Sequence, residues 1–190
     1  VCSPIWVYDG LFYVEQDTVH MARAIDSGIH DAITSVFKID EQGGMTMLED
    51  NGYPSFRGFP SFPKKEISIG DFWEAKAIRA VDPTGQGLIT RMPIYIQYTL
   101  TGTREFNESP VYVIKAVWAT RYGYGIGVSY EDFDGDPNLK SASGKHDATL
   151  YVDMVTGAAL LIRDTVDETF VYKDGSKIAY KGTISLFTDY

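Results

Sequence analysis

The stretch 149-TLYVDMVTGAALLIRDTVDETFVYKDGSKIAYKGTISLF-187 decides the fold class of this chain. Two short turns, Val155-Thr156-Gly157 and Asp174-Gly175, divide it, and both are typical of β-hairpins. The runs between them are rich in β-branched and aromatic residues, which favour pleated strands. The stretch therefore predicts consecutive antiparallel strands, with these bounds: Thr149–Met154, Ala158–Arg163, Glu168–Lys173 and Lys177–Phe187.

The region upstream continues the same pattern. Trp73–Val81 is a short run that ends at the turn Asp82-Pro83-Thr84-Gly85, and Met92–Thr101 alternates in period two. Val111–Arg121 is mostly apolar on both faces, which predicts a central strand covered on both sides. Residues 73–190 are thus predicted to form an antiparallel meander.

The first half is less regular. Ile5–Val14 is apolar and aromatic enough for a strand, whereas Thr18–Phe37 fits either a helix or strands. Poor helix formers at the end of that run favour strands from Ile29 onward, with a return strand at Met45–Leu48. The sequence predicts one mainly β domain over residues 1–190, an antiparallel β-sandwich or open barrel with at most one short helix in the first 40 residues.

Two connectors stand out. Residues 51–66 contain Pro54, Pro60 and Pro63, which predicts an extended crossing segment. Tyr122–Ser143 contains four glycines and an acidic cluster, which predicts a flexible loop. We expect both to be exposed, with packing on their own domain as the alternative, and an interface would be sought first at Pro54–Pro63 and Tyr122–Ser143.

Composition narrows the choice of partners. The net charge is −9, and such an acidic surface repels phosphate backbones, so we expect no nucleic-acid partner. The single cysteine, Cys2, rules out an intramolecular disulfide. It could be a lipid-attachment site, but a small residue without a role is the favoured interpretation. Because the chain begins without Met, we expect a processed piece.

The densest acidic cluster is a weak candidate for a metal site. Carboxylate oxygens suit hard cations such as Ca²⁺. However, Gly135 falls two positions too early for an EF-hand loop, and Ser143 stands where the final Glu is needed. A solvated acidic loop is favoured over a site built from these residues: Glu131, Asp132, Asp134 and Asp136.

Catalytic patterns are missing from the sequence. The three histidines show no metal-ligand spacing, and His146, before a predicted strand, is expected to cap it or face solvent. No GxSxG motif occurs. Asp164 is expected to pair with Arg163 or Lys177, while Asp167 and Glu168 point to opposite faces of a strand. We therefore expect no enzyme activity and no cofactor.

Aromatic residues make up 14% of the chain. Most are expected in the core, but some could line a ligand cavity in a curved sheet or an interface. The candidates are Phe56, Phe59, Phe62, Trp73, Trp118 and Tyr124.

One part of the sequence resembles a known family. Pro54-Ser-Phe-Arg-Gly-Phe-Pro-Ser-Phe-Pro63, followed by Gly70-Asp-Phe-Trp73, is similar to an "FPxFP … GDxW" signature of spirochaete envelope proteins of the OmpA family. The likeness covers most of residues 45–190. In that family such a β region precedes a C-terminal domain that binds peptidoglycan, and the βαβ pattern of that domain does not occur in residues 1–190. No peptidoglycan-binding residue can therefore be assigned here.

The resemblance implies a periplasmic place, with or without an anchor at the outer membrane, and envelope or cell-wall proteins as partners. We expect a noncatalytic envelope module, a scaffold or spacer that accompanies a peptidoglycan-binding domain. The alternative is a periplasmic carrier that holds a lipid or another apolar ligand in its curved sheet.

Overall fold

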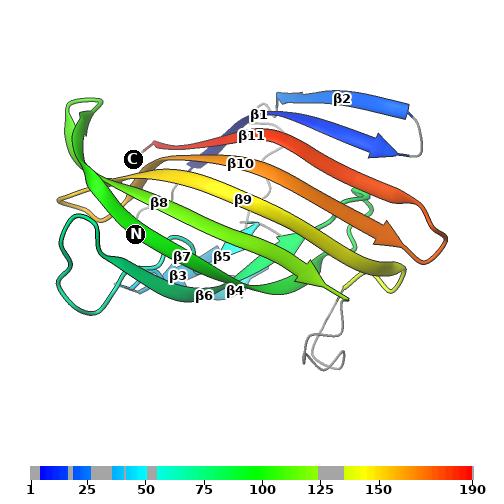
Figure 1. Ribbon diagram of the computed structural model, residues 1–190, viewed down its shortest axis with the longest axis horizontal. Helices are drawn as coiled ribbons and strands as arrows, with labels where there is room; N and C mark the ends of the chain where they lie inside the picture. The colour runs from blue at the N-terminus through cyan, green and yellow to red at the C-terminus, as the bar shows by residue number, and fades with distance from the viewer. Residues whose placement is uncertain are drawn as a thin grey trace.

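A computed structural model describes residues 5–16, 19–26, 36–40, 42–50, 55–123 and 135–189. These residues form a curled antiparallel sheet shaped as a half-barrel, with a small second sheet beside it (Figure 1). The large sheet has nine strands in the order β2-β1-β11-β10-β9-β8-β7-β6-β5. Their bounds are β1 Ile5–Gln16, β2 Val19–Asp26, β5 Phe56–Arg57, β6 Phe72–Val81, β7 Thr90–Phe106, β8 Ser109–Tyr122, β9 Leu139–Asp153, β10 Ala159–Tyr172 and β11 Lys177–Asp189.

The meander over residues 73–190 is confirmed, since β6 to β11 are neighbours in chain order and every pair is antiparallel. The Asp174-Gly175 turn joins β10 to β11, and Gly175 donates a backbone hydrogen bond to Tyr172. The predicted strand in Ile5–Val14 is also confirmed as β1, which pairs with the last strand, β11.

The ambiguous region Thr18–Phe37 is resolved in part. Residues 19–26 form β2, and β3 (Val36–Ile39) pairs with β4 (Met45–Glu49) in the small sheet. Residues 27–35, where strands were favoured from Ile29, lie outside the described residues. The part of the chain described here contains no helix, and hence none long and apolar enough to cross a bilayer.

Two predicted boundaries were wrong. The runs Ala158–Arg163 and Glu168–Lys173 belong to one strand, β10, because the polar residues between them continue the alternation of inward and outward side chains. The predicted loop Tyr122–Ser143 is too long, since residues 139–143 open β9 with Leu139 and Ala142 buried. Residues 124–134 of that loop lie outside the described residues.

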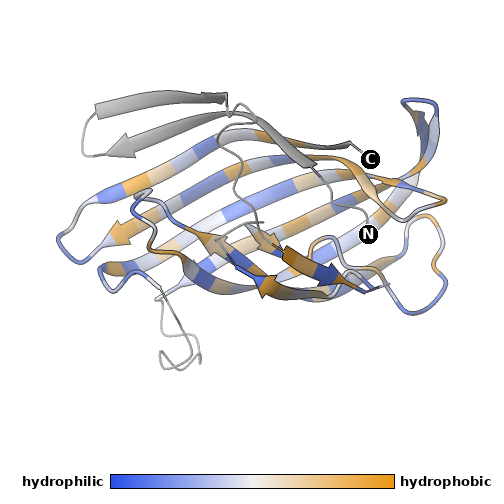
Figure 2. Cartoon of the chain, turned by 180° about the vertical axis from the view of Figure 1, so that it is seen from behind, coloured by the Kyte–Doolittle hydropathy of each residue, from blue (hydrophilic) through white to orange (hydrophobic). Residues whose placement is uncertain are grey.

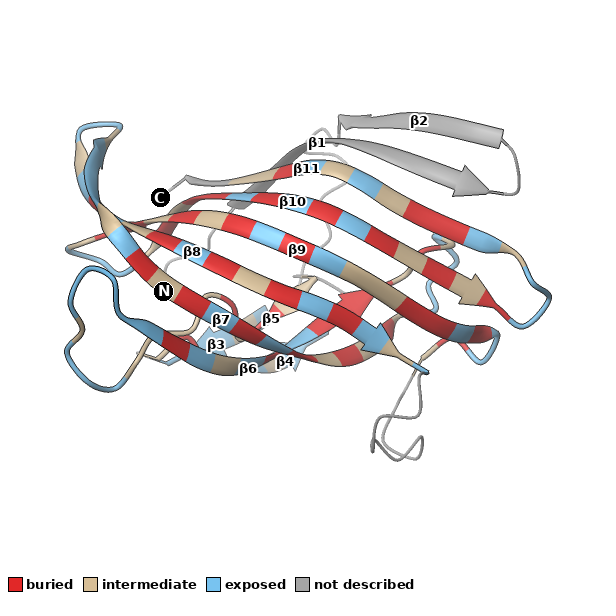
Figure 3. Cartoon of the chain, in the orientation of Figure 1, coloured by how far each residue is buried: buried red, intermediate tan, exposed pale blue. Residues whose placement is uncertain are grey.

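Burial alternates along the long strands, so the sheet has one covered face and one solvated face (Figure 3). In β8, the buried side includes Ile114, Ala116 and Trp118, whereas Lys115 and Ala119 on the other side are exposed. The strand is central, as predicted, but the prediction that both faces are covered was wrong. On the outer face of β8, Lys115, Ala119 and Arg121 are exposed to solvent.

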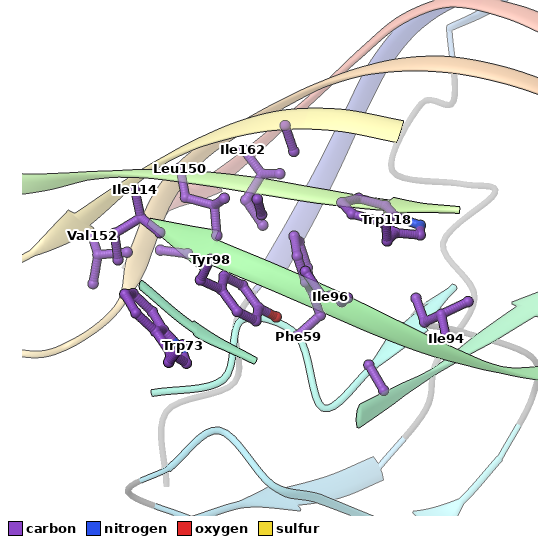
Figure 4. Close-up of a cluster of buried hydrophobic side chains, with 14 of the residues drawn as sticks. Phe59, Trp73, Ile94, Ile96, Tyr98, Ile114, Trp118, Leu150, Val152 and Ile162 are labelled. Carbon is purple, nitrogen blue, oxygen red and sulfur yellow. The ribbon is translucent and has the colours of Figure 1, made fainter. Parts of the chain in front are cut away.

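The segment 55–63, called the aromatic segment below, fills part of the concave face. Its Phe59 ring packs on Tyr98 and Trp118, with ring centroids 6.0 and 5.3 Å apart, and Tyr98 stacks on Trp73 at 5.2 Å (Figure 4). Phe59 is 7% exposed. Of this segment only Phe56–Arg57 is strand, and its aromatic side chains pack into the core of the sheet, so the prediction of an exposed connector was wrong and the alternative, packing on its own domain, holds.

Hydrogen bonds also fasten the aromatic segment. The Trp73 indole N–H donates to the Ser61 carbonyl at 2.8 Å, and the Ser61 N–H donates to the Tyr98 hydroxyl at 3.3 Å. The Arg57 guanidinium lies against the Asp50 carboxylate, with both N···O distances 2.6 Å. A bidentate pair of this kind fixes direction as well as position.

The β3–β4 hairpin lies on the same side of the large sheet as β5. In Figure 2, the view from behind, this hairpin is nearer to the viewer than the large sheet. The Phe62 N–H donates to the Gln42 carbonyl at 2.9 Å. At Gly43 an added Cβ would lie 2.0 Å from the Pro60 carbonyl oxygen, so only glycine permits this close approach. The hairpin and the aromatic segment therefore pack as one layer.

Candidate functional site

Charged side chains from the neighbouring strands β9 and β10 meet one from β6, three strands away from β9 in the sheet order, on the concave face. His146 lies in the middle of β9, Arg79 in β6, and Asp164 and Glu168 in β10. Each is at most 6% exposed. They share one face because His146 pairs across strands with Trp118 and Val166, which places it between Asp164 and Glu168.

His146 is held between two carboxylates. Its Nδ1 lies 2.6 Å from Asp164 Oδ2, and its Nε2 lies 2.9 Å from Glu168 Oε1. The first contact is a hydrogen bond, whereas at the second the N–H points too far from the oxygen for a well-formed one. Both contacts are close enough for ion pairs.

Glu168 joins the histidine to two further groups. The Arg79 guanidinium lies 3.2 Å from Glu168 Oε2, and the Thr120 hydroxyl donates to Oε1 at 2.6 Å. The carboxylate is fully buried, and a buried charge is tolerated only where such partners compensate for lost water. These contacts define the charged cluster: Arg79, Thr120, His146, Asp164 and Glu168.

Aromatic rings enclose the charged cluster. Trp118 stacks on the His146 ring, with centroids 4.4 Å apart and planes 11° apart. The Phe56 ring meets His146 edge-on at 5.8 Å and lies 4.6 Å from the Arg79 guanidinium carbon. The aromatic segment thus covers the cluster directly, and a cation over a ring face adds attraction.

The environment shifts the pKa values of the cluster in a consistent way. Burial alone would lower the pKa of His146, but the hydrogen bond with Asp164, the close contact of Glu168 and the charges of both carboxylates outweigh it and raise that pKa above 6.5. Burial would raise the pKa of Glu168, but Arg79, His146 and Thr120 bring it well below 4.5. The geometry therefore favours the charged forms of both.

Some buried polar atoms of this region have no hydrogen-bond partner within the described part of the chain. They are Arg79 Nε, Trp118 Nε1, Asp164 Oδ1 and, despite its close contact with Glu168, His146 Nε2. All belong to residues that are at most 6% exposed.

Comparison of the chain with protein-family models, curated proteins and solved structures finds no match. The chemistry of the site must be argued from its own residues. Across the described ranges there is no group of three or more His, Cys, Asp and Glu side chains arranged to hold a metal ion.

The structure brings several of the sequence-predicted aromatic candidates together. Phe59, Trp73 and Trp118 are buried in one cluster, with Phe56 and Phe62 packed against it. Tyr124 lies outside the described residues. These rings fill the concave face, because they contact one another rather than line a space.

The acidic candidates are only partly described. Asp136 is 5% exposed and accepts a hydrogen bond from the Asn138 N–H at 2.8 Å. Its own N–H donates to the Thr90 hydroxyl at 3.0 Å. Glu131, Asp132 and Asp134 lie outside the described residues, so the proposed metal loop stays a prediction.

Two open hollows occur at the ends of the half-barrel, away from the charged cluster. One of about 430 Å³ is lined by residues from Thr103 to Pro110 with Met154. The other, of about 380 Å³, lies among three connections and includes Asp136, Tyr172 and Ser176. Neither is lined by the aromatic candidates.

Two sequence predictions about the cluster were wrong. His146 does not cap a strand or face solvent, since β9 begins at Leu139 and carries it into the interior. Asp164 pairs with His146 instead of Arg163 or Lys177, because it points to the concave face. The prediction that Asp167 and Glu168 point to opposite faces is confirmed by exposed fractions of 61% and 0% for their side chains.

Gly144 makes room for the charged cluster. It stands opposite Glu168 in the β9–β10 pair, and a Cβ there would lie 2.6 Å from Glu168 Cγ. The same Cβ would lie 2.7 Å from the Asp167 carbonyl oxygen. Glycine at this position therefore lets the Glu168 side chain lie flat across β9 toward Thr120.

Gly144→Ala is expected to lower the free energy of unfolding by about 1–3 kcal/mol, the usual cost of overpacking a filled interior. Chemical denaturation measures it. Gly102→Ala is the matched control, since that strand glycine has no heavy atom within 4 Å of the added Cβ. Equal effects of the two substitutions would contradict this packing.

Proposed function

We propose that this chain is a noncatalytic structural module of a cell envelope, a scaffold or spacer beside a wall-binding domain. The observation that carries the proposal is the filled concave face. A half-barrel is a common shape for a ligand carrier, but here Phe59, Trp73 and Trp118 are buried against one another. A rigid, filled sheet suits a part that holds other parts at a distance.

The charged cluster supports a structural role as well. A catalytic group must reach a substrate, whereas the side chains of His146 and Glu168 are 0% exposed. Their partners are one another, Arg79 and Asp164. Such a buried set of ion pairs stabilises one arrangement of strands.

The envelope placement rests on the resemblance of residues 54–73 to OmpA-family proteins of spirochaetes. In this chain those residues include the aromatic segment and Trp73, which hold the concave face together. The partners implied are envelope or cell-wall proteins, and peptidoglycan would be reached through another domain.

Native mass spectrometry of the purified chain, with organic extraction of what accompanies it, tests this function. We expect the mass of the unliganded chain, unchanged when phospholipids and fatty acids are offered. A stoichiometric lipid in either experiment would contradict the scaffold and favour the carrier. As a control, Phe59→Ala removes a ring from the interior and should create the space that the native chain lacks.

A further inference from the structure

We propose that the concave face carries a pH-responsive latch: the protonated His146 ring holds the aromatic segment on the sheet, and loss of that proton releases the segment. The latch goes beyond a scaffold role, because it gives the module two states. It is built from contacts on both sides of one imidazole.

Both ring nitrogens of His146 face carboxylate oxygens. Asp164 Oδ2 is 2.6 Å from Nδ1, and Glu168 Oε1 is 2.9 Å from Nε2. A neutral imidazole carries one N–H, so it can satisfy only one of the two carboxylates and presents a lone pair to the other. With both carboxylates ionised, only the doubly protonated, cationic ring makes both contacts attractive.

The charge balance of the cluster also favours a protonated His146. Arg79 is always cationic, while Asp164 and Glu168 supply two carboxylates. With His146 protonated, two positive charges face two negative charges, and the buried set is neutral. Deprotonation leaves one uncompensated negative charge in a region at most 6% exposed, which costs several kcal/mol unless water enters.

Water can enter most directly by displacing the aromatic segment. Phe56 lies edge-on to His146 at 5.8 Å and to Trp118 at 5.2 Å, so it covers the ring that titrates. Its strand, β5, has only two residues and two register partners in β6. The β5 ladder therefore contributes little to holding this cover, and displacing it means breaking the Phe59 packing and the Ser61 hydrogen bonds described above.

The other described groups around His146 do not compensate for the lost proton. Arg79 of β6 is already paired with Glu168, and β8 contributes the uncharged Trp118 and Thr120. Tyr180 of β11 lies opposite Glu168, and burial raises the pKa of its hydroxyl to about 12, so it remains neutral.

The pH range follows from the directions of the two shifts. The pKa of His146 is raised above 6.5, so its contribution is complete below pH 6.5 and is lost as pH rises through the folded pKa. The pKa of Glu168 is lowered from 4.5, so its contribution is complete above pH 4.5 and is lost at acid pH. The latch is tightest between about pH 4.5 and 6.5.

NMR of the full chain labelled with ¹⁵N tests the latch. The imidazole ¹⁵N signals of His146 are identified by their absence in His146→Gln. Both nitrogens should remain protonated at pH 6.5, so the midpoint of their titration should lie above 6.5. The Ser61 and Phe62 amides, which are hydrogen-bonded to Tyr98 and Gln42, should change shift and lose exchange protection with the same midpoint. A midpoint at or below 6.5, or amides that do not change with it, would overturn the proposal.

Two variants make the test specific. Asp164→Asn removes one carboxylate, so the His146 midpoint and the change in the segment should both move to lower pH. Asp167→Asn removes a charge from the exposed face of the same strand and should leave both unchanged. If the His146 midpoint and the midpoint of the aromatic segment shifted in different directions in Asp164→Asn, the coupling between them would be contradicted. The pH titration of the unmodified chain tests the latch even if a variant fails to fold.

Discussion

Glu168→Gln is expected to lower the free energy of unfolding by about 3–5 kcal/mol, the usual cost of breaking a buried ion pair from one side. The substitution keeps the shape of the side chain but leaves Arg79 buried without its carboxylate, 3.2 Å away. It also removes one of the two charges that keep His146 protonated. For a chain of this length, the melting temperature should fall by about 6–20 °C.

Thermal and denaturant unfolding measure this effect, and Asp167→Asn is the matched control. Asp167 is the adjacent residue, with a side chain 61% exposed and a Lys181 partner at 3.5 Å. Exposed pairs of this kind contribute little. If the two variants lost the same stability, the charged cluster would not be the source of the difference.

Phe59→Ala is expected to cost about 3–5 kcal/mol, since it removes a buried ring and leaves a cavity. Phe59 is 7% exposed and touches both Tyr98 and Trp118, so the space cannot close without moving the aromatic segment. Denaturant unfolding gives the value directly.

Phe72→Ala provides the control for ring removal. Phe72 is 62% exposed at the start of β6, so its loss should change stability little. A small effect at Phe59 as well would mean that the aromatic segment is not packed into the sheet as described.

Much of the sheet could be predicted from sequence, because local signals decide hairpins. The Asp174-Gly175 turn and the alternation in Met92–Thr101 lead directly to β10–β11 and to β7. The predicted strands divide β10 at Asp164–Asp167, where two aspartates interrupt the run of apolar residues. Its alternation was nevertheless present, with Val166 and Phe170 on the same parity as Glu168.

The charged cluster could not be predicted for a different reason. Its members are far apart in the chain, with Arg79 and Glu168 separated by 89 positions, and only the curled run of five paired strands, β6 to β10, brings them together. A signal was available within β10: if it is one strand, Asp164 and Glu168 fall on the same face as the buried Ile162. The burial of the aromatic segment was not predicted, because its prolines are typical of an exposed connector. Its three phenylalanines pack against the core of the sheet instead.

Cysteine accessibility on the concave face tests the central claim, that this face is filled by the chain itself. In a Cys2→Ser background, Ala116→Cys places a thiol on β8 beneath the aromatic segment, at a position 0% exposed, and Ala119→Cys places one on the exposed face of the same strand. Near pH 6, where the latch is closed, we expect a maleimide to label the new side chain of Ala119→Cys at the rate of a free thiol. In Ala116→Cys, labelling should occur only in molecules that unfold, so its rate should be limited by unfolding. Equal labelling rates in the folded protein would mean that the concave face is open, and would contradict the account.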